Sequence, residues 1–211
     1  MLSQLKNTHQ INMNKIEYKS SITTGSLLVR ESQIIARLLL ENTDNNAWHQ
    51  AIVIDNILQK RSPESAKKQA GLIKERLTLM KPEFWKLIDQ GNTDIVIQAL
   101  LAASIKHSRL LGDFMLNVIK SHWQVFIKKI TANDWQDYLE MCAQLDPGVQ
   151  LWTESTQTKL KQTIFRILAE ARYIDNTRSL ELLPVSLSTD VKIYLLNNSE
   201  HYILKCMEVT P

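Results

Sequence analysis

Lysines recur at a regular spacing between residues 60 and 81. Lys60, Lys67, Lys74 and Lys81 lie seven residues apart, and on a straight helix this spacing drifts by only about 20° per heptad. Ser62-Pro63-Glu64 is a helix start signal that places a hydroxyl, a proline and an acid in the preferred order. Ammonium groups in such a row can neutralise successive phosphates of a nucleic acid, although a solvated helix face gives the same pattern. The residues predicted to contact phosphate here are Lys60, Lys67, Lys68, Lys74 and Arg76.

A second set of polar side chains begins a later helix. Asp146-Pro147-Gly148 ends one predicted helix, and Thr153 or Ser155 then caps a long helix that reaches Ala171. A helix-turn-helix presents the first residues of its second helix to base edges in the major groove. An ordinary capped helix with an exposed polar end fits equally well, because the connection after Gly148 is longer than a tight turn. The residues predicted to contact DNA on this helix are Ser155, Thr156, Lys159, Lys161, Gln162 and Arg166.

Residue patterns typical of catalysis are missing from the sequence. It has no glycine-rich phosphate loop, no HExxH and no GxSxG. Asp134 and Asp137 share a helical face, but they fall in the first turn, where they compensate the helix dipole. The two cysteines, Cys142 and Cys206, form no CxxC pair, so we interpret them as small buried hydrophobic residues. We therefore expect neither an enzyme, nor a metal site, nor a cofactor.

Charge is segregated along a chain whose net charge is only +3 over 211 residues. Residues 57–86 hold eight basic and three acidic side chains (+5), and residues 104–130 hold five and one (+4). Residues 131–158 hold five acids and no Lys or Arg (−5), and residues 159–178 hold five basic and two acidic side chains (+3). Blocks of one sign can form local surfaces that attract a charged polymer. The distribution therefore predicts an anionic partner, which the total alone does not.

The elements that must position these residues are predicted to be helices. Only five glycines and five prolines occur, too few for the frequent turns of a many-stranded protein. Further helices are expected over residues 26–41 and 47–60, from Lys81-Pro82 to a left-handed C-cap at Gly91, from Asn92 to about Lys106, from Arg109 onward, and from Asn133-Asp134.

We expect an all-α, compact, multi-helix globular protein, with a short extended run at residues 180–185 as a possible β wing. The predicted divisions are a polar N-terminal arm (residues 1–17), a helical N-terminal lobe (18–130) and a C-terminal lobe like a helix-turn-helix or winged helix (131–211). The two lobes can also form one continuous domain.

No segment of the sequence predicts a membrane span or a secretory signal. The most apolar window, residues 95–105, is about half the ~20 residues that a spanning helix needs, and no apolar stretch follows the first residues. We expect a cytoplasmic protein, and the absence of heptad seams favours a monomer.

Several short motifs, taken together in their order and spacing, resemble the BrxA family of BREX (bacteriophage exclusion) systems. The resemblance covers nearly the whole chain from about residue 18, and one departure is Ala171-Arg172, where the family commonly has a glycine. The motifs are Tyr18-Lys19-Ser20-Ser21-Ile22-Thr23-Thr24-Gly25-Ser26-Leu27-Leu28, Glu31-Ser32, Ile35-Ala36, Phe84-Trp85 with Gly91, Gln98-Ala99-Leu100-Leu101, Ser108-Arg109-Leu110-Leu111 with Asp113-Phe114, and the helix from Trp152 to Ile174.

The resemblance implies a small all-α accessory protein of a phage-defence island that also encodes a methyltransferase, ATPases and a phosphatase-like protein. It further implies DNA binding through helix-turn-helix-like elements and a core similar to the transcription antitermination factor NusB. The leading hypothesis is a non-catalytic double-stranded-DNA-binding component with other BREX proteins as partners. Two alternatives are an adaptor that docks larger defence proteins without binding DNA, and RNA binding by analogy with NusB.

Overall fold

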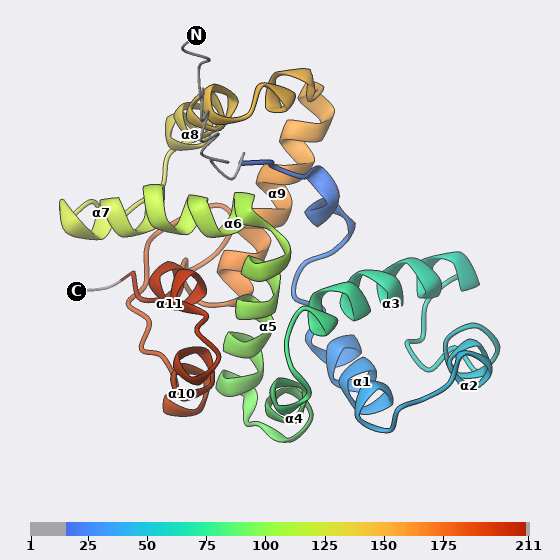
Figure 1. Cartoon of the computed structure of the whole chain (residues 1–211). Helices are drawn as coiled ribbons and strands as arrows, with labels where there is room; N and C mark the ends of the chain where they lie inside the picture. Colours follow the sequence, from blue (N-terminus) through green and yellow to red (C-terminus); the bar gives the residue numbers. More distant parts are fainter. Residues whose placement is uncertain (1–15, 210–211) are drawn as a thin grey trace, which may run out of the picture.

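The computed structural model describes residues 16–209, and the chain over this range is all-α, as predicted (Figure 1). The predicted N-terminal arm lies almost wholly outside the described residues. The first part of the chain forms the 3₁₀ helix η1 (Ser20–Thr24), α1 (Val29–Leu40), α2 (Asn45–His49), the π turn η2 (Gln50–Ile54), α3 (Pro63–Thr78), α4 (Pro82–Gln90) and α5 (Thr93–His107).

The second part of the chain continues the helical pattern. A long helical run is divided by a π turn, and a 3₁₀ helix separates two of the later helices. The elements are α6 (Arg109–Phe114), the π turn η3 (Met115–Ile119), α7 (Lys120–Gln124), α8 (Ala132–Leu145), the 3₁₀ helix η4 (Pro147–Leu151), α9 (Glu154–Glu170), α10 (Thr189–Asn197) and α11 (His201–Met207).

Side-chain caps explain where several helices begin. The Ser62 hydroxyl accepts a hydrogen bond from the Ser65 N–H (3.2 Å), and the Asn92 side chain accepts one from the Ile95 N–H (3.0 Å). Both bonds satisfy N–H groups that have no partner within the helix. These two predicted starts are confirmed, and α8 begins one residue earlier than predicted because Thr131 is its cap.

The predicted helix over residues 47–60 is wrong over residues 55–60. The helical run stops at Ile54, and Asn56 then takes a left-handed backbone conformation (φ 46°). The Asn56 amide bonds both the N–H and the carbonyl of Lys60, each at 2.9 Å. A short amide side chain tolerates this conformation and competes for backbone groups, so Asn56 ends the helix and leaves Lys60 in a loop.

Helix α5 is the centre of the packing. It contacts helices on both sides. Its residues from Val96 to Ile105 are all buried except Ile97, which is half-buried. Figure 1 shows α1, α2 and α3 to one side of α5, and α10 and α11 to the other. Of the helices that the structure describes, none has both the length and the apolar character to cross a bilayer. The apolar window predicted from the sequence is therefore a core helix.

Buried residues from both predicted lobes form a single cluster. It runs from Tyr18 through Phe84 and Phe114 to Ile164 and Met207. The boundary between residues 130 and 131 remains a prediction, because a shared core is compatible with either description.

Several helices end in a left-handed residue that is not glycine. Asn42, Phe126, Arg172 and Ser199 all have φ between 51° and 61°, and each follows a helix with the paired backbone bonds of a Schellman motif. This conformation costs an L-residue about 1–2 kcal/mol. All five glycines lie in the described part of the chain, and none has a positive φ.

The predicted left-handed C-cap at Gly91 is therefore wrong. Gly91 is extended (φ −68°, ψ 158°). A Cβ at this position would lie 2.3 Å from the Leu87 carbonyl oxygen and 2.7 Å from a methyl group of Ile95. Glycine is needed here for the close approach of α4 to α5, and not for its access to positive φ.

The predicted wing at residues 180–185 is held inside a small three-segment arrangement. Its backbone forms isolated antiparallel bridges, Lys129 with Glu181 and Ile174 with Leu182, and no longer strand occurs within residues 16–209. The Leu182 N–H donates to the Lys128 carbonyl (2.8 Å), and the Leu183 N–H donates to the Tyr173 carbonyl (3.0 Å). The run is thus bonded on both edges, unlike the free hairpin of a winged helix.

Candidate nucleic-acid interface

One side of α9 carries a continuous row of exposed polar and basic side chains. Ser155, Lys159, Gln162 and Arg166 are all exposed, and their spacing places them within about 60° of arc on a helix. At 1.5 Å per residue the row is about 16 Å long, comparable with the ~12 Å width of the DNA major groove. The opposite side of the helix is buried through Leu160, Ile164, Phe165, Ile167 and Leu168. We call this row the α9 row.

Two predicted residues of this helix lie beside the row. Thr156 is half-buried, and its N–H donates to the capping Thr153 hydroxyl (3.2 Å). Lys161 is half-buried with its ammonium 5.7 Å from the centre of the Phe165 ring. Thr156 therefore forms part of the helix start, whereas Lys161 borders a neighbouring groove.

The groove lies between α9 and the loop that precedes the bridged run. Its volume is about 600 Å³, and Leu180 is one of the residues that line it. The loop is tied down by Asp175, whose carboxylate accepts hydrogen bonds from the Ser179 hydroxyl (2.5 Å) and the Glu181 N–H (2.9 Å). The hydrogen bond from Ser179 and those from backbone N–H groups hold the pKa of Asp175 below its ordinary value. The lining residues are Thr158, Lys161, Gln162, Phe165, Arg166, Thr177 and Leu180.

Three exposed basic residues that were not predicted as site residues lie on the segments next to this groove. Lys128 and Lys129 belong to the segment bridged to residues 181 and 182, and Arg178 lies in the loop. The charge count of +4 for residues 104–130 was a signal for the two lysines. It could not place them near the bridged run, because that neighbourhood depends on backbone bonds between residues 128–130 and residues 180–182.

Aromatic packing fixes α9 against the body of the protein. The rings of Phe114 on α6, Trp135 and Tyr138 on α8, and Phe165 on α9 pack with centroids 5.1–6.0 Å apart. The connection between α8 and α9 spans residues 146–153 and includes η4, longer than the 3–4-residue turn of a helix-turn-helix. The interpretation of α8 and α9 as a helix-turn-helix therefore stays a prediction.

The C-terminal end of α9 is also fixed by polar contacts. The Glu170 carboxylate accepts a hydrogen bond from the Leu27 N–H (2.8 Å). Arg172 adopts the left-handed conformation in place of glycine, and its guanidinium donates to Asp94 (2.8 Å). The chain therefore makes a sharp turn after α9 without the glycine that is common there in the family it resembles.

The predicted α3 surface is smaller than expected. Lys67 and Lys68 are exposed and border a shallow pocket of about 300 Å³ with Ser21, Thr24 and Glu75. Neither lysine has an ion pair among residues 16–209. Lys74 is half-buried, and its ammonium lies 4.4 Å from the centre of the Trp48 ring. Lys67 and Lys68 remain available to an anionic ligand, and Lys74 is partly engaged within the protein.

Arg76 does not belong to this surface. The residue is 4% exposed, and its guanidinium donates to the carbonyls of Ser26 (2.5 Å) and Gly25 (2.9 Å). Burial lowers the pKa of Arg76 to about 10, which leaves the cation charged at neutral pH. The prediction that Arg76 contacts phosphate is wrong, because a periodic count of charges does not show which side of the helix packs inward.

Lys60 is likewise unsuited to the predicted row. It lies in the loop that follows Asn56, and its ammonium pairs with Glu31 at 2.5 Å, with both side chains largely buried. The hydrogen bond from Lys60 also holds the pKa of Glu31 below its ordinary value, despite partial burial acting in the opposite direction. Lys81 lies before α4 and does not continue α3.

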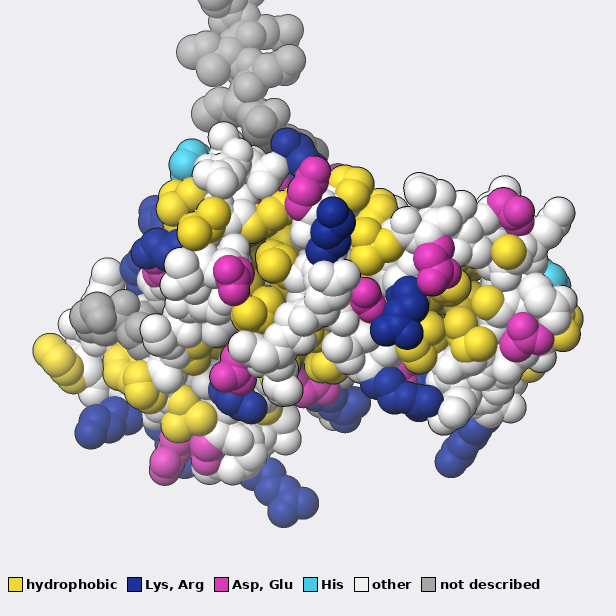
Figure 2. Space-filling view, turned by 90° about the horizontal axis from the view of Figure 1, so that it is seen from below, with side chains coloured by type: hydrophobic (Ala, Val, Ile, Leu, Met, Phe, Trp, Pro, Cys, Tyr) yellow, Lys and Arg dark blue, Asp and Glu magenta, His cyan; other side chains and the backbone are white. Residues whose placement is uncertain are grey.

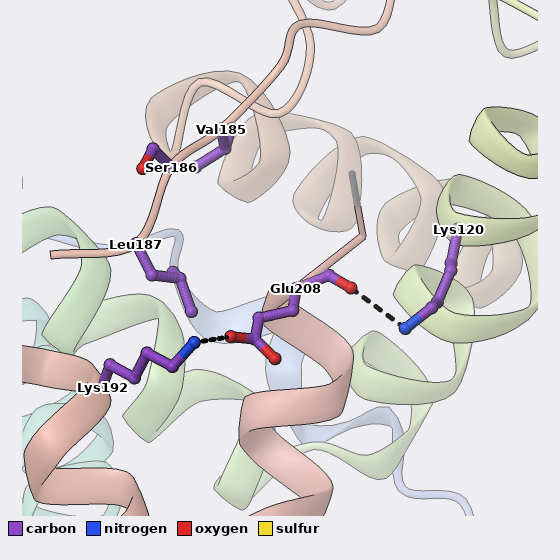
Figure 3. A pocket seen from close by; sticks show the side chains of 6 residues that line it. All are labelled: Lys120, Val185, Ser186, Leu187, Lys192 and Glu208. Atoms are coloured by element: carbon purple, nitrogen blue, oxygen red, sulfur yellow. Dashed lines mark hydrogen bonds and ion pairs between the residues drawn. The ribbon is translucent and has the colours of Figure 1, made fainter. Parts of the chain in front are cut away.

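Another pocket has a volume of about 430 Å³. Figure 3 shows that both of its lysines have a partner. The Lys192 ammonium pairs with the Glu208 carboxylate (2.6 Å), and the Lys120 ammonium donates to the Glu208 carbonyl (3.0 Å). The remaining lining comes from Val185, Ser186 and Leu187. Because Glu208 neutralises or occupies both cations, this pocket is a weaker anion site than the groove beside α9.

A further pair of titratable side chains, His122 and Asp134, lies outside these surfaces. The His122 Nε2 atom lies 3.2 Å from the Asp134 Oδ1 atom. No group of three or more His, Cys, Asp or Glu residues within the described residues could hold a metal ion.

Figure 2 shows that, on the face seen from below, basic side chains are interspersed with acidic and hydrophobic ones. That face offers no continuous basic surface in the part of the chain described.

Comparisons with known proteins give a consistent result. The sequence model of the BrxA family matches residues 16–199. The chain is 41% identical over 198 residues to the BREX protein BrxA of Paramagnetospirillum magneticum, covering 94% of this chain and 100% of that protein. It is 32% identical over 184 residues to the BREX protein BrxA of Escherichia coli O9:H4, covering 87% and 86% respectively. The crystal structure of an uncharacterized protein from Magnetospirillum magneticum matches with a TM-score of 0.85 and 40% identity, covering 92% of this chain and 100% of that one.

Proposed function

The chain belongs to the BrxA family of BREX phage-defence proteins, and from this premise we propose that it is a non-catalytic accessory component that binds double-stranded DNA. The observation that carries the proposal is the α9 row, an exposed line of Ser155, Lys159, Gln162 and Arg166 on a helix whose other side is fixed in the core. Other BREX proteins are its expected partners.

Each residue of the α9 row has a chemical role in this proposal. Lys159 and Arg166 neutralise phosphates, and each contact releases condensed counterions. Ser155 and Gln162 can donate to and accept from base edges or phosphate oxygens. Lys128, Lys129 and Arg178 extend the positive surface beyond the groove, whereas Lys67 and Lys68 on α3 form a separate contact.

Fluorescence polarisation with a short labelled duplex tests the proposal. If six or more phosphates are contacted, the affinity should fall about a thousandfold or more between ~50 and ~200 mM salt. The triple variant with Lys67→Glu, Lys68→Glu and Lys159→Glu, three exposed lysines, should lose most of the affinity. Absence of binding at low salt, or an unchanged affinity of the triple variant, would contradict the proposal.

The acidic surface of α8 favours a second function as a docking adaptor. Asp137, Glu140 and Leu145 are exposed on this helix, and Leu151 is exposed at the end of η4. Such a surface repels DNA and suits a protein partner. The adaptor would be supported by co-purification with another BREX protein in nuclease-treated extracts, provided that the double variant Asp137→Lys with Glu140→Lys loses it.

Competition between duplex DNA and structured RNA in the polarisation assay separates the DNA proposal from RNA binding.

A further inference from the structure

The turn after α7 displays three apolar side chains to solvent. Val125, Phe126 and Ile127 are 63%, 86% and 46% exposed. The backbone around them is well defined by hydrogen bonds, because the Phe126 N–H donates to the Trp123 carbonyl (3.3 Å) and the Ile127 N–H donates to the His122 carbonyl (2.9 Å). Figure 1 shows that α7 projects at the edge of the molecule. We call residues 125–127 the α7 tip.

Phe126 is an unusual residue for its position. It is the left-handed residue of the Schellman motif that ends α7 (φ 61°), where glycine or asparagine is preferred. The equivalent positions elsewhere hold the polar residues Asn42, Arg172 and Ser199, and Arg172 forms an ion pair. A bulky aromatic side chain gains no burial here that offsets its strained backbone. A strained, exposed aromatic residue is therefore better explained by contact with another molecule than by the fold.

The charge around the tip indicates what that molecule is. Residues 114–133 contain no Asp or Glu, and the tip is followed directly by the exposed Lys128 and Lys129. The backbone bridge places the exposed Glu181 opposite Lys129, which leaves Lys128 as the cation of this pair that is not bridged to an acidic residue. The next residue, Ile130, donates through its N–H to the Leu180 carbonyl (3.0 Å), and Leu180 lines the groove beside Lys161 and Arg166. Backbone bonds thus connect the tip to the proposed DNA surface.

We propose that the α7 tip is a wedge that inserts Phe126 between base pairs of the duplex, while Lys128 and Lys129 hold the flanking phosphates. This inference rests on the proposed function and adds the mode of contact. Proteins that insert an apolar side chain into the minor groove unstack a base step and kink the duplex. The wedge requires a projecting apolar residue with cations beside it, which is what this turn provides.

The experiment is a titration of duplexes that carry 2-aminopurine, whose emission rises when its stacking is lost. The wild-type chain should raise the emission, and Phe126→Ala should abolish the rise and weaken binding about tenfold, as expected for loss of one stacked aromatic. The salt dependence of Phe126→Ala should equal that of the wild type, because an apolar contact releases no counterions. Phe126→Trp should retain the rise. Ile54→Ala, which removes another exposed apolar side chain, is the matched control.

The outcomes separate the wedge from the proposed function. Tight binding of duplex without a rise in emission, or equal affinity of Phe126→Ala and the wild type, overturns the wedge and leaves DNA binding intact. No binding of any duplex overturns both. If phosphatidylglycerol vesicles shift the tryptophan emission of Phe126→Trp to the blue, beyond any shift of the wild type, and duplex does not, the wedge is also overturned and a lipid surface is the partner.

Discussion

Individual residues with similar sequence signals have very different surroundings in this protein. Arg76 and Lys68 belong to the same basic segment, yet Arg76 is enclosed by backbone carbonyls of residues 25 and 26, and Lys68 faces solvent. The Arg76 guanidinium donates to two carbonyls of the chain between η1 and α1, those of Gly25 and Ser26. The sequence shows how many charged residues a segment contains, but packing decides which of these side chains can reach a ligand.

We expect Arg76→Ala to destabilise the protein by about 3 kcal/mol or more, because the buried carbonyl of Ser26 and the half-buried carbonyl of Gly25 lose a charged donor. Lys68→Ala should change the free energy of unfolding by no more than about 0.5 kcal/mol, since its side chain is exposed. Urea denaturation followed by circular dichroism measures both. Equal effects of the two substitutions would refute the assignment of Arg76 to the core.

Replacing the left-handed residues with glycine should stabilise the fold. Phe126→Gly removes the cost of the left-handed conformation, about 1–2 kcal/mol. Glycine also makes the unfolded chain more flexible, which offsets about 0.5–1 kcal/mol of this gain in the free energy of unfolding. Ser199→Gly makes the same backbone change at the end of α10 and should give a similar gain. A lower urea midpoint for both variants would show that these positions are not strained.

The two thiols should be unreactive in the folded protein. Burial raises the pKa of Cys142 to about 11 and that of Cys206 to about 12, and the thiolate is the reactive form. Ellman's reagent at pH 8 should label neither thiol until a denaturant is added. Rapid labelling of the native protein would contradict the buried placement of both side chains.

The helices illustrate how local signals succeed where tertiary contacts do not intervene. Helix α8 begins with a capping box in which the Asp134 N–H donates to the Thr131 hydroxyl (3.3 Å) and the Thr131 N–H donates to the Asp134 carboxylate (2.6 Å). Partial burial opposes ionisation of this carboxyl, but the hydrogen bonds from Thr131 and the nearby His122 hold the pKa of Asp134 below its ordinary value. The start of α8 is thus both a hydrogen-bonded and an electrostatic unit.

Thr131→Ala should lower the free energy of unfolding by about 1 kcal/mol through loss of the cap, as measured by urea denaturation.

The contribution of Asp134 to stability depends on pH in a definite direction. Because its pKa is lowered on folding, the ionised carboxylate stabilises the protein above the ordinary value of 3.8, and this stabilisation is lost as the pH falls through the folded pKa. The stability difference between wild type and Asp134→Asn should therefore be largest near neutral pH and shrink in acid. A difference that grew in acid would contradict the assignment.

Helix starts at Ser62 and Asn92 were predictable because the cap and the first turn are adjacent in sequence. The end at Ile54 was not, because it depends on how the Asn56 amide bonds residue 60. The extended conformation of Gly91 was not predictable either, because the need for glycine there arises from the close contact between α4 and α5. For the candidate site, the exposed row on α9 followed from helical spacing, whereas the neighbouring Lys128, Lys129 and Arg178 required the pairing of segments far apart in the chain.

At the scale of the whole molecule, the segregated charge becomes a set of separate surfaces on one body. Lys159 and Arg166 lie on the α9 row, with Lys161 in the groove beside it. Lys67 and Lys68 lie on a separate surface of α3, and α8 presents the acidic residues Asp137 and Glu140. A shared core from Tyr18 to Met207 holds these surfaces in fixed relative positions. The modest net charge therefore does not limit binding of a polyanion, because attraction depends on the local surface.

The most direct test of the account is the slope of duplex affinity against salt for two matched pairs of substitutions. Lys159→Ala with Arg166→Ala removes both cations of the α9 row, and Lys81→Ala with Lys86→Ala removes two exposed cations at the start and on the surface of α4. We predict that the first pair reduces the magnitude of the slope by about two, one for each lost phosphate contact, and that the second pair leaves it unchanged. Equal slopes for the wild type and the first pair, or an equal reduction by both pairs, would contradict the claim that α9 binds DNA.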